Sequence, residues 1–132
     1  GQRGEGTRLK MQCRTGTLPE NALLHARRQA GHVACALCGE PETVTHLVAE
    51  CPAYAELRAE LFDELRPLFG AQRQAAYTAL LAAGGDDQVA ILLSDQYWVK
   101  FGQFTTANRS VCSFLRRVWA AREQYTAAVA AG

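Results

Sequence analysis

Apolar side chains recur every three or four positions along most of this chain, and strict strand-like alternation is hard to find. The clearest stripe follows Pro52 and consists of Tyr54, Leu57, Leu61, Leu65 and Leu68, with acidic side chains between them. This spacing lines up one face of an amphipathic helix. We therefore expect a small all-α domain, in which Pro67 ends or kinks this helix.

Further helices are predicted on both sides of the stripe. Periodic apolar residues and capping signals place them at residues 7–15, 17–31, 43–50, 72–83 and 105–128, and at 86–93 with Asp86 or Asp87 as its N-cap. Residues 97–102 fit a loop, a short helix or the start of the last helix. We interpret residues 1–132 as a single domain, with a polar and flexible lead at residues 1–6.

Four metal-ligating side chains are the most informative feature of the chain. Cys35, Cys38, His46 and Cys51 follow the spacing C-x2-C-x7-H-x4-C in the segment 33–52. Thiolate and imidazole are ligands that zinc selects, and structural zinc is nearly always bound by four of them in a tetrahedron. Four protein ligands leave no position for a reactive water, so we predict one structural Zn²⁺ ion and no catalytic residues.

The second ligand pair has an unusual spacing. His46 and Cys51 are five residues apart, and regular helices bring together residues three or four apart. Pro52 disfavours helical backbone at Cys51. We therefore expect the helix that carries His46 to end near Cys51, so that the sulfur can turn back toward the metal.

Other interpretations of these residues stay open from spacing alone. His32 could replace His46 as the fourth ligand, the C-x2-C pair could be a redox pair, or the thiols could be ordinary buried side chains. Cys13 and Cys112 are expected to be small buried residues. Trp98 and Trp119 could stack on bases, although tryptophans at helical spacing more commonly fill a core.

The net charge of +1 hides an uneven distribution. Residues 1–34 carry a net charge of +4, residues 35–70 carry −5 and residues 71–132 carry +2. Phosphate backbones are attracted to basic segments and repelled by acidic ones. The five cysteines, three of them at metal spacing with His46, favour a reducing compartment, and hence an intracellular location in the nucleus or cytoplasm. No apolar run is long enough for a membrane span, and we expect no signal peptide, because the start of the sequence is polar and lacks an apolar region.

The segment that begins at Cys35 resembles the zinc-binding (CCHC knuckle) segment near the C-terminus of non-LTR (LINE-type) retrotransposon reverse transcriptases. The residues that carry the resemblance are the four ligands together with Gly39, Glu42, Thr43, Leu47, Pro52, Tyr54 and Arg58. Cys13–Pro19 looks like the Arg-x-Gly-x-Leu-Pro segment that precedes such knuckles, and Phe114–Arg122 looks like the closing helix. The strong part of the resemblance covers about residues 13–66.

The resemblance implies a zinc knuckle in a helical domain that contacts RNA or target DNA as part of a larger reverse transcriptase. It does not imply catalysis here, because neither a Tyr-x-Asp-Asp polymerase signature nor an endonuclease motif is present. We expect weakly sequence-selective, electrostatic binding of RNA or DNA through the basic residues Lys10, Arg14, Arg27, Arg28, Arg116 and Arg117. The alternative is a zinc-scaffolded protein-interaction module that docks on the polymerase or a host factor through the acidic helix after Pro52.

Overall fold

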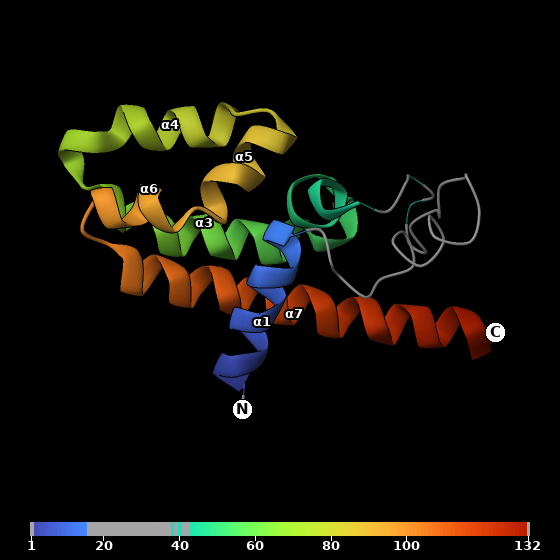
Figure 1. Ribbon diagram of the computed structural model, residues 1–132. Coiled ribbons are helices and arrows are strands. Elements are labelled where there is room, and N and C mark those ends of the chain that lie inside the picture. Colours follow the sequence, from blue (N-terminus) through green and yellow to red (C-terminus); the bar gives the residue numbers. More distant parts are fainter. Residues whose placement is uncertain (1, 16–37, 39, 41–42, 132) are drawn as a thin grey trace.

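The computed structural model describes residues 2–15, 38, 40 and 43–131 (Figure 1). Every regular element within these residues is helical, so the predicted all-α class is confirmed. None of these helices combines the length and the apolar character that crossing a lipid bilayer requires.

A long C-terminal helix, α7 (Phe104–Ala131), runs across the whole molecule and supports the rest of the fold (Figure 1). Helix α3 (Ala55–Phe69) packs along α7, and α1 (Gln2–Thr15) also contacts it. The short helices α4 (Gln74–Ala82) and α5 (Gly85–Leu92) form a second layer on the other side of α3 from α7. Helix α6 (Asp95–Lys100) leads from this layer back to α7.

The predicted stripe after Pro52 forms the buried side of α3. Leu61 and Leu65 are essentially inaccessible to solvent, and Tyr54 is 1% exposed. Helix α3 continues two residues beyond Pro67 and ends at Phe69, where Gly70 adopts a positive φ of 67° that suits glycine. The largest fully buried side chains of the core are Trp98, Tyr54, Leu47, Leu61, Leu65, Leu80, Leu92, Val111 and Val118.

Aromatic packing explains the uncertain stretch at residues 97–102. Its residues 97–100 belong to α6, whose N-cap Ser94 accepts a hydrogen bond from the backbone N–H of Tyr97 at 3.1 Å. Trp98 lies at 0% exposure, with its ring centroid 5.6 Å from that of Phe69 in an edge-to-face arrangement. Trp98 is therefore a core residue and does not present its ring to solvent.

Two sequence-based predictions are corrected by the structure. Helix α1 begins at Gln2, so residues 2–6 belong to a helix, whereas a flexible lead was predicted there. Helix α5 has Gly84 as its N-cap and no side-chain cap, so neither Asp86 nor Asp87 caps it. The reason for the second difference is tertiary, since the Asp86 carboxylate accepts a hydrogen bond from Thr45 instead.

Helix α1 approaches α7 closely at Gly6. A Cβ atom placed on Gly6 would lie 2.7 Å from the carbonyl oxygen of Cys112 and 2.8 Å from its Cβ. Any larger residue would force the two helices apart, so glycine is required here by the packing of α1 on α7.

Candidate metal centre

A short helical turn carries His46 and Cys51, two of the predicted ligands. It starts after Thr43, whose Oγ1 accepts a hydrogen bond from the backbone N–H of His46 at 3.0 Å and whose carbonyl accepts one from Leu47. This is the N-cap function for which threonine is favoured, because the first N–H groups of a helix have no partner within it. The cap fixes the point at which His46 enters the turn.

The turn is a π-helix, η1 (His46–Glu50), which explains the five-residue ligand spacing. The backbone N–H of Cys51 donates to the carbonyl of His46 at 2.6 Å, a bond between residues five apart. Such a bond brings His46 and Cys51 one above the other. The helix ends at Cys51, as predicted, since Cys51 is extended (ψ 122°) and Pro52 starts the 3₁₀ turn η2 (Pro52–Tyr54).

Arg58 ties this turn to α3. Its Nε donates to the carbonyl of Val48 at 2.9 Å, and its Nη2 donates to the carbonyl of Cys51 at 3.1 Å. Burial lowers the pKa of Arg58, while the neighbouring Cys51 and Glu50 favour its charged form. The guanidinium therefore holds the backbone of a ligand in place from a partly buried position.

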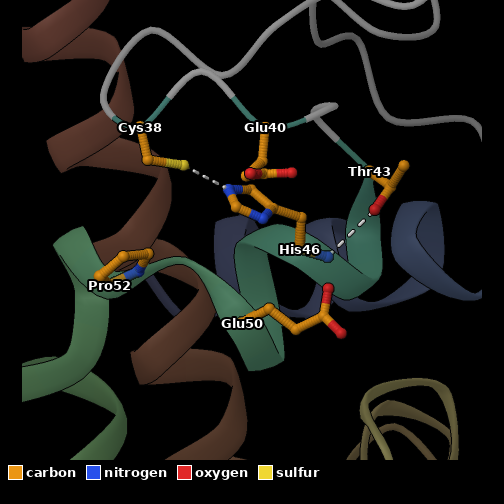
Figure 2. A pocket seen from close by; sticks show the side chains of 6 residues that line it. All are labelled: Cys38, Glu40, Thr43, His46, Glu50 and Pro52. Carbon is orange, nitrogen blue, oxygen red and sulfur yellow. Dashed lines mark hydrogen bonds between the residues drawn. The ribbon is translucent and has the colours of Figure 1, made fainter.

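The side chains of Cys38, His46 and Cys51 converge at one point. Their ligand atoms all lie within 4.8 Å of one another. The Cys38 side chain reaches down to the His46 ring, with Sγ 3.1 Å from Nε2 (Figure 2). Cys51 and His46 are buried at 0% and 5% exposure, whereas Cys38 is exposed. The three residues thus form a cluster that could hold a metal ion.

The donor set of this cluster suits zinc. Two sulfurs and one imidazole nitrogen are borderline-soft ligands, and no carboxylate is among them. Tetrahedral zinc with bonds of about 2.0–2.3 Å holds neighbouring ligand atoms about 3.5–3.8 Å apart. Movements of about 1 Å would bring the three atoms to that spacing. The fourth predicted ligand, Cys35, and the alternative ligand His32 lie outside the described residues.

The turn is also docked on α5. Thr45 Oγ1 donates to Asp86 Oδ1 at 2.6 Å. A Cβ on Gly85 would meet the Glu50 carboxylate at 2.6 Å, so this acidic group lies at the N-terminal turn of α5, where the helix dipole favours negative charge. Cys38, Glu40, Thr43, His46, Glu50 and Pro52 line an open hollow of about 560 Å³ around the candidate centre (Figure 2).

Part of this chain is similar to a retrotransposon polyprotein. It is 35% identical over 80 residues to a "Retrovirus-related Pol polyprotein from type-1 retrotransposable element R1 4" of Nasonia vitripennis. The match covers 61% of this chain and 20% of that protein, so the chain spans about a fifth of the relative's length. No family model and no solved structure matches the chain. The similarity supports a non-LTR retrotransposon origin for this sequence.

The structure places the predicted nucleic-acid contacts in different environments. Arg27 and Arg28 lie outside the described residues, as does the side chain of Arg14. Lys10 is only 4% exposed, and its ammonium group lies 2.7 Å from Asp95 Oδ1 and 2.5 Å from Asn108 Oδ1. Lys10 is therefore engaged inside the fold, between α1, α6 and α7.

The two predicted arginines of α7 remain near the surface. Arg117 is exposed and forms an ion pair with Glu60 of α3, 2.6 Å apart. Arg116 is half-buried and lines a hollow between α1 and α7, together with Arg109. The structure thus separates the two residues, with Arg117 directed to α3 and Arg116 to the groove beside α1.

Three residues with roles at or near these sites were not assigned by the sequence. Thr43 and Arg58 belong to the residues that carry the family resemblance, but the sequence assigned them no role. In the structure Thr43 caps the turn at residues 46–51, and Arg58 clamps its end to α3. The signal for Thr43 was a threonine three residues before His46, which is N-cap spacing. Arg109 gave no signal, because its position in a groove depends on how α1 packs against α7.

Proposed function

We propose that this chain is a zinc-stabilised, non-catalytic nucleic-acid-binding domain of a non-LTR retrotransposon reverse transcriptase. The observation that carries the proposal is the convergence of Cys38, His46 and Cys51 within 4.8 Å. The similarity to a retrotransposon Pol polyprotein supports a place in a larger polypeptide. In this proposal Cys35 is the fourth ligand, and the ion is structural.

The role of the metal in this proposal is to stabilise the fold. Ligand burial and the clamp by Arg58 join the candidate centre to the core through η1 and α3. Zinc bound by Cys35, Cys38, His46 and Cys51 would hold the segment before η1 to the helical body. Free energies of zinc binding linked to folding are on the order of 10 kcal/mol or more.

Metal content and melting temperature test the zinc assignment. The wild-type protein should carry one zinc per chain, and a chelator should lower its melting temperature. Cys38→Ser should remove both the metal and the chelator effect. Cys13→Ser is the matched control, because Cys13 lies in α1 outside the ligand spacing. A Cys38→Ser protein that binds zinc and melts like the wild type would contradict the proposal.

The proposed partner is RNA or DNA, bound mainly through phosphate contacts and with weak sequence selectivity. The basic segment at residues 1–34 and the arginines of α7 support this, since each phosphate contact releases counterions and makes binding salt-dependent. Fluorescence anisotropy of a labelled single-stranded RNA at several salt concentrations tests it. Micromolar or tighter binding with a steep salt slope is expected, and Arg27→Ala/Arg28→Ala should weaken it in a folded protein.

A second candidate function is docking on another protein. It is favoured by the acidic outer face of α3, where Glu56 and Asp63 are exposed and the surrounding segment, residues 35–70, carries a net charge of −5. A folded, zinc-loaded protein that binds no nucleic acid at low salt would favour this function. The remainder of the polymerase or a host protein would then be the partner.

A further inference from the structure

A polar hollow lies between α1 and α7, away from the candidate metal centre. Its volume is about 420 Å³, and its lining residues are Thr7, Thr105, Asn108, Arg109, Cys112, Ser113 and Arg116. Arg109 and Arg116 are seven residues, or about two turns and 10 Å, apart on α7. Two guanidinium groups therefore flank the hollow along its helical wall.

The side chains that line this hollow are rich in hydrogen-bond donors. Besides the two arginines it presents three hydroxyl groups and one amide, and no carboxylate is among the lining residues that the structure describes. Cys112 does not add negative charge, because burial raises the pKa of its thiol, although Lys10 and Arg116 oppose this effect. The balance of charge and donors in the hollow suits an anion.

The buried ion pair of Lys10 sets the orientation of one of these donors. Lys10 Nζ donates to Asn108 Oδ1, which fixes the carbonyl end of the amide toward α1. Among the residues that the structure describes, Asn108 Nδ2 has no acceptor, so it can donate to a ligand in the hollow. The nearby carboxylate of Asp95 is paired with Lys10 at 2.7 Å, so its charge is compensated. Lys10 thus supports the hollow from behind and does not itself reach the ligand.

We propose that this hollow binds backbone phosphate groups of a nucleic-acid strand, with Arg109 and Arg116 as the charged contacts and Asn108 as a neutral donor. The inference rests on the proposed nucleic-acid function, and it locates that binding at the hollow between α1 and α7. Arginine suits this role because its guanidinium can donate two parallel hydrogen bonds to a phosphate. Arg109 is exposed at the rim and Arg116 is half-buried, so a phosphate can approach from solvent.

The test compares two charge-matched double variants of the full chain. Arg109→Gln/Arg116→Gln removes the charges at the hollow, and Arg66→Gln/Arg73→Gln removes two from exposed positions elsewhere. Circular dichroism and melting temperature establish that both are folded. Anisotropy with a labelled single-stranded RNA is then measured over a range of salt concentrations. NMR signals of the arginine Nε–H groups are recorded with the RNA and with inorganic phosphate.

The hollow variant should bind RNA about tenfold or more weakly at low salt, with a salt slope smaller by about 1.4 for two lost single-strand contacts. The control variant should lose far less, and RNA should shift the Arg109 and Arg116 signals. If the wild type binds RNA and both variants lose the same amount of RNA affinity, the hollow is not the phosphate-binding site. The proposed nucleic-acid function would still stand. A folded wild-type protein that binds neither single-stranded RNA nor DNA would overturn both proposals, and a shift with inorganic phosphate alone would then identify a site for a small anion.

Discussion

Removing Arg58 is the sharpest perturbation of the turn at residues 46–51 that leaves all predicted metal ligands in place. Arg58→Ala deletes both hydrogen bonds from α3 to the end of η1, at 2.9 Å to Val48 and 3.1 Å to Cys51. The Val48 carbonyl then loses the hydrogen bond from Arg58 Nε. The Cys51 carbonyl keeps its longer bond from the backbone N–H of Tyr54, at 3.2 Å. The backbone of Cys51 is no longer held against the core.

The expected loss of stability follows from these two bonds. A hydrogen bond from a charged donor contributes about 1.5–3 kcal/mol, so two contribute about 3–6 kcal/mol at most. Arg58 is only half-buried, and water will replace part of what is lost. We therefore expect the free energy of unfolding to fall by about 2–3 kcal/mol. For a domain of this size that lowers the melting temperature by roughly 6–15 °C.

Thermal melting of the zinc-loaded protein, followed by far-UV circular dichroism, measures this loss, and competition with a chelator measures zinc affinity. Groups that orient metal ligands typically affect metal affinity about 10–100-fold, and we expect Arg58→Ala to weaken zinc binding within that range. Arg58→Lys should recover little, because an ammonium group lacks the two-armed geometry that reaches both carbonyls. Arg66→Ala, at an exposed position of the same helix, is the matched control.

Equal melting temperatures for Arg58→Ala and Arg66→Ala would refute the reasoning. That result would mean that the turn is held by its own backbone bonds and by its docking on α5. A loss of stability without any loss of zinc affinity would refute only the second step, the coupling between the clamp and the metal ligands.

Three further predictions concern α1 and the helix cap. Gly6→Ala should lower the free energy of unfolding by about 1–3 kcal/mol, because the new methyl group overlaps the Cys112 carbonyl. Gly84→Ala meets no atom within 4 Å and should cost clearly less, since it changes only the N-cap of α5; equal melting temperatures of the two variants would contradict the close approach of α1 to α7. Lys10→Met should lower the unfolding free energy by about 1–3 kcal/mol in denaturant titrations, with only a small effect on RNA affinity. A large loss of RNA binding in a stable Lys10→Met protein would show that Lys10 contacts phosphate directly. Thr43→Ala should cost about 1 kcal/mol in thermal melts and weaken zinc binding, and a variant as stable as the exposed control Thr78→Ala would exclude the capping role.

The sequence predicted the helices well where the signal is local, that is, where residues within the same helix determine its structure. The apolar stripe of α3 is a local, periodic signal, and Leu61 and Leu65 are buried as it requires. The predicted start of the last helix, at residue 105, is one residue from the observed start at Phe104. These features follow from neighbours three and four apart, which sequence inspection can detect.

Features that depend on distant residues were not predictable in this way. The partners of Lys10 are Asp95 and Asn108, which lie 85 and 98 residues away along the chain. Inspection of charge alone therefore assigned Lys10 to a phosphate-contacting surface. The hollow lined by Arg109 lies where α1 approaches α7, next to Gly6 and Cys112, and this packing joins residues about 100 positions apart.

The candidate metal centre depends both on local sequence signals and on contacts with distant parts of the fold. Sequence spacing predicted His46 and Cys51 as ligands, although five residues of α-helix turn through about 500°, which would leave the two side chains about 140° apart around the helix axis. The π-helical bond from Cys51 to His46 removes this difficulty. Such a turn is uncommon on its own, and here Thr43 holds its start while Arg58 holds its end. The helical body thus positions two buried candidate ligands, His46 and Cys51. A metal ion would pull the exposed Cys38 toward them. The unusual spacing is then a consequence of how the core supports the site.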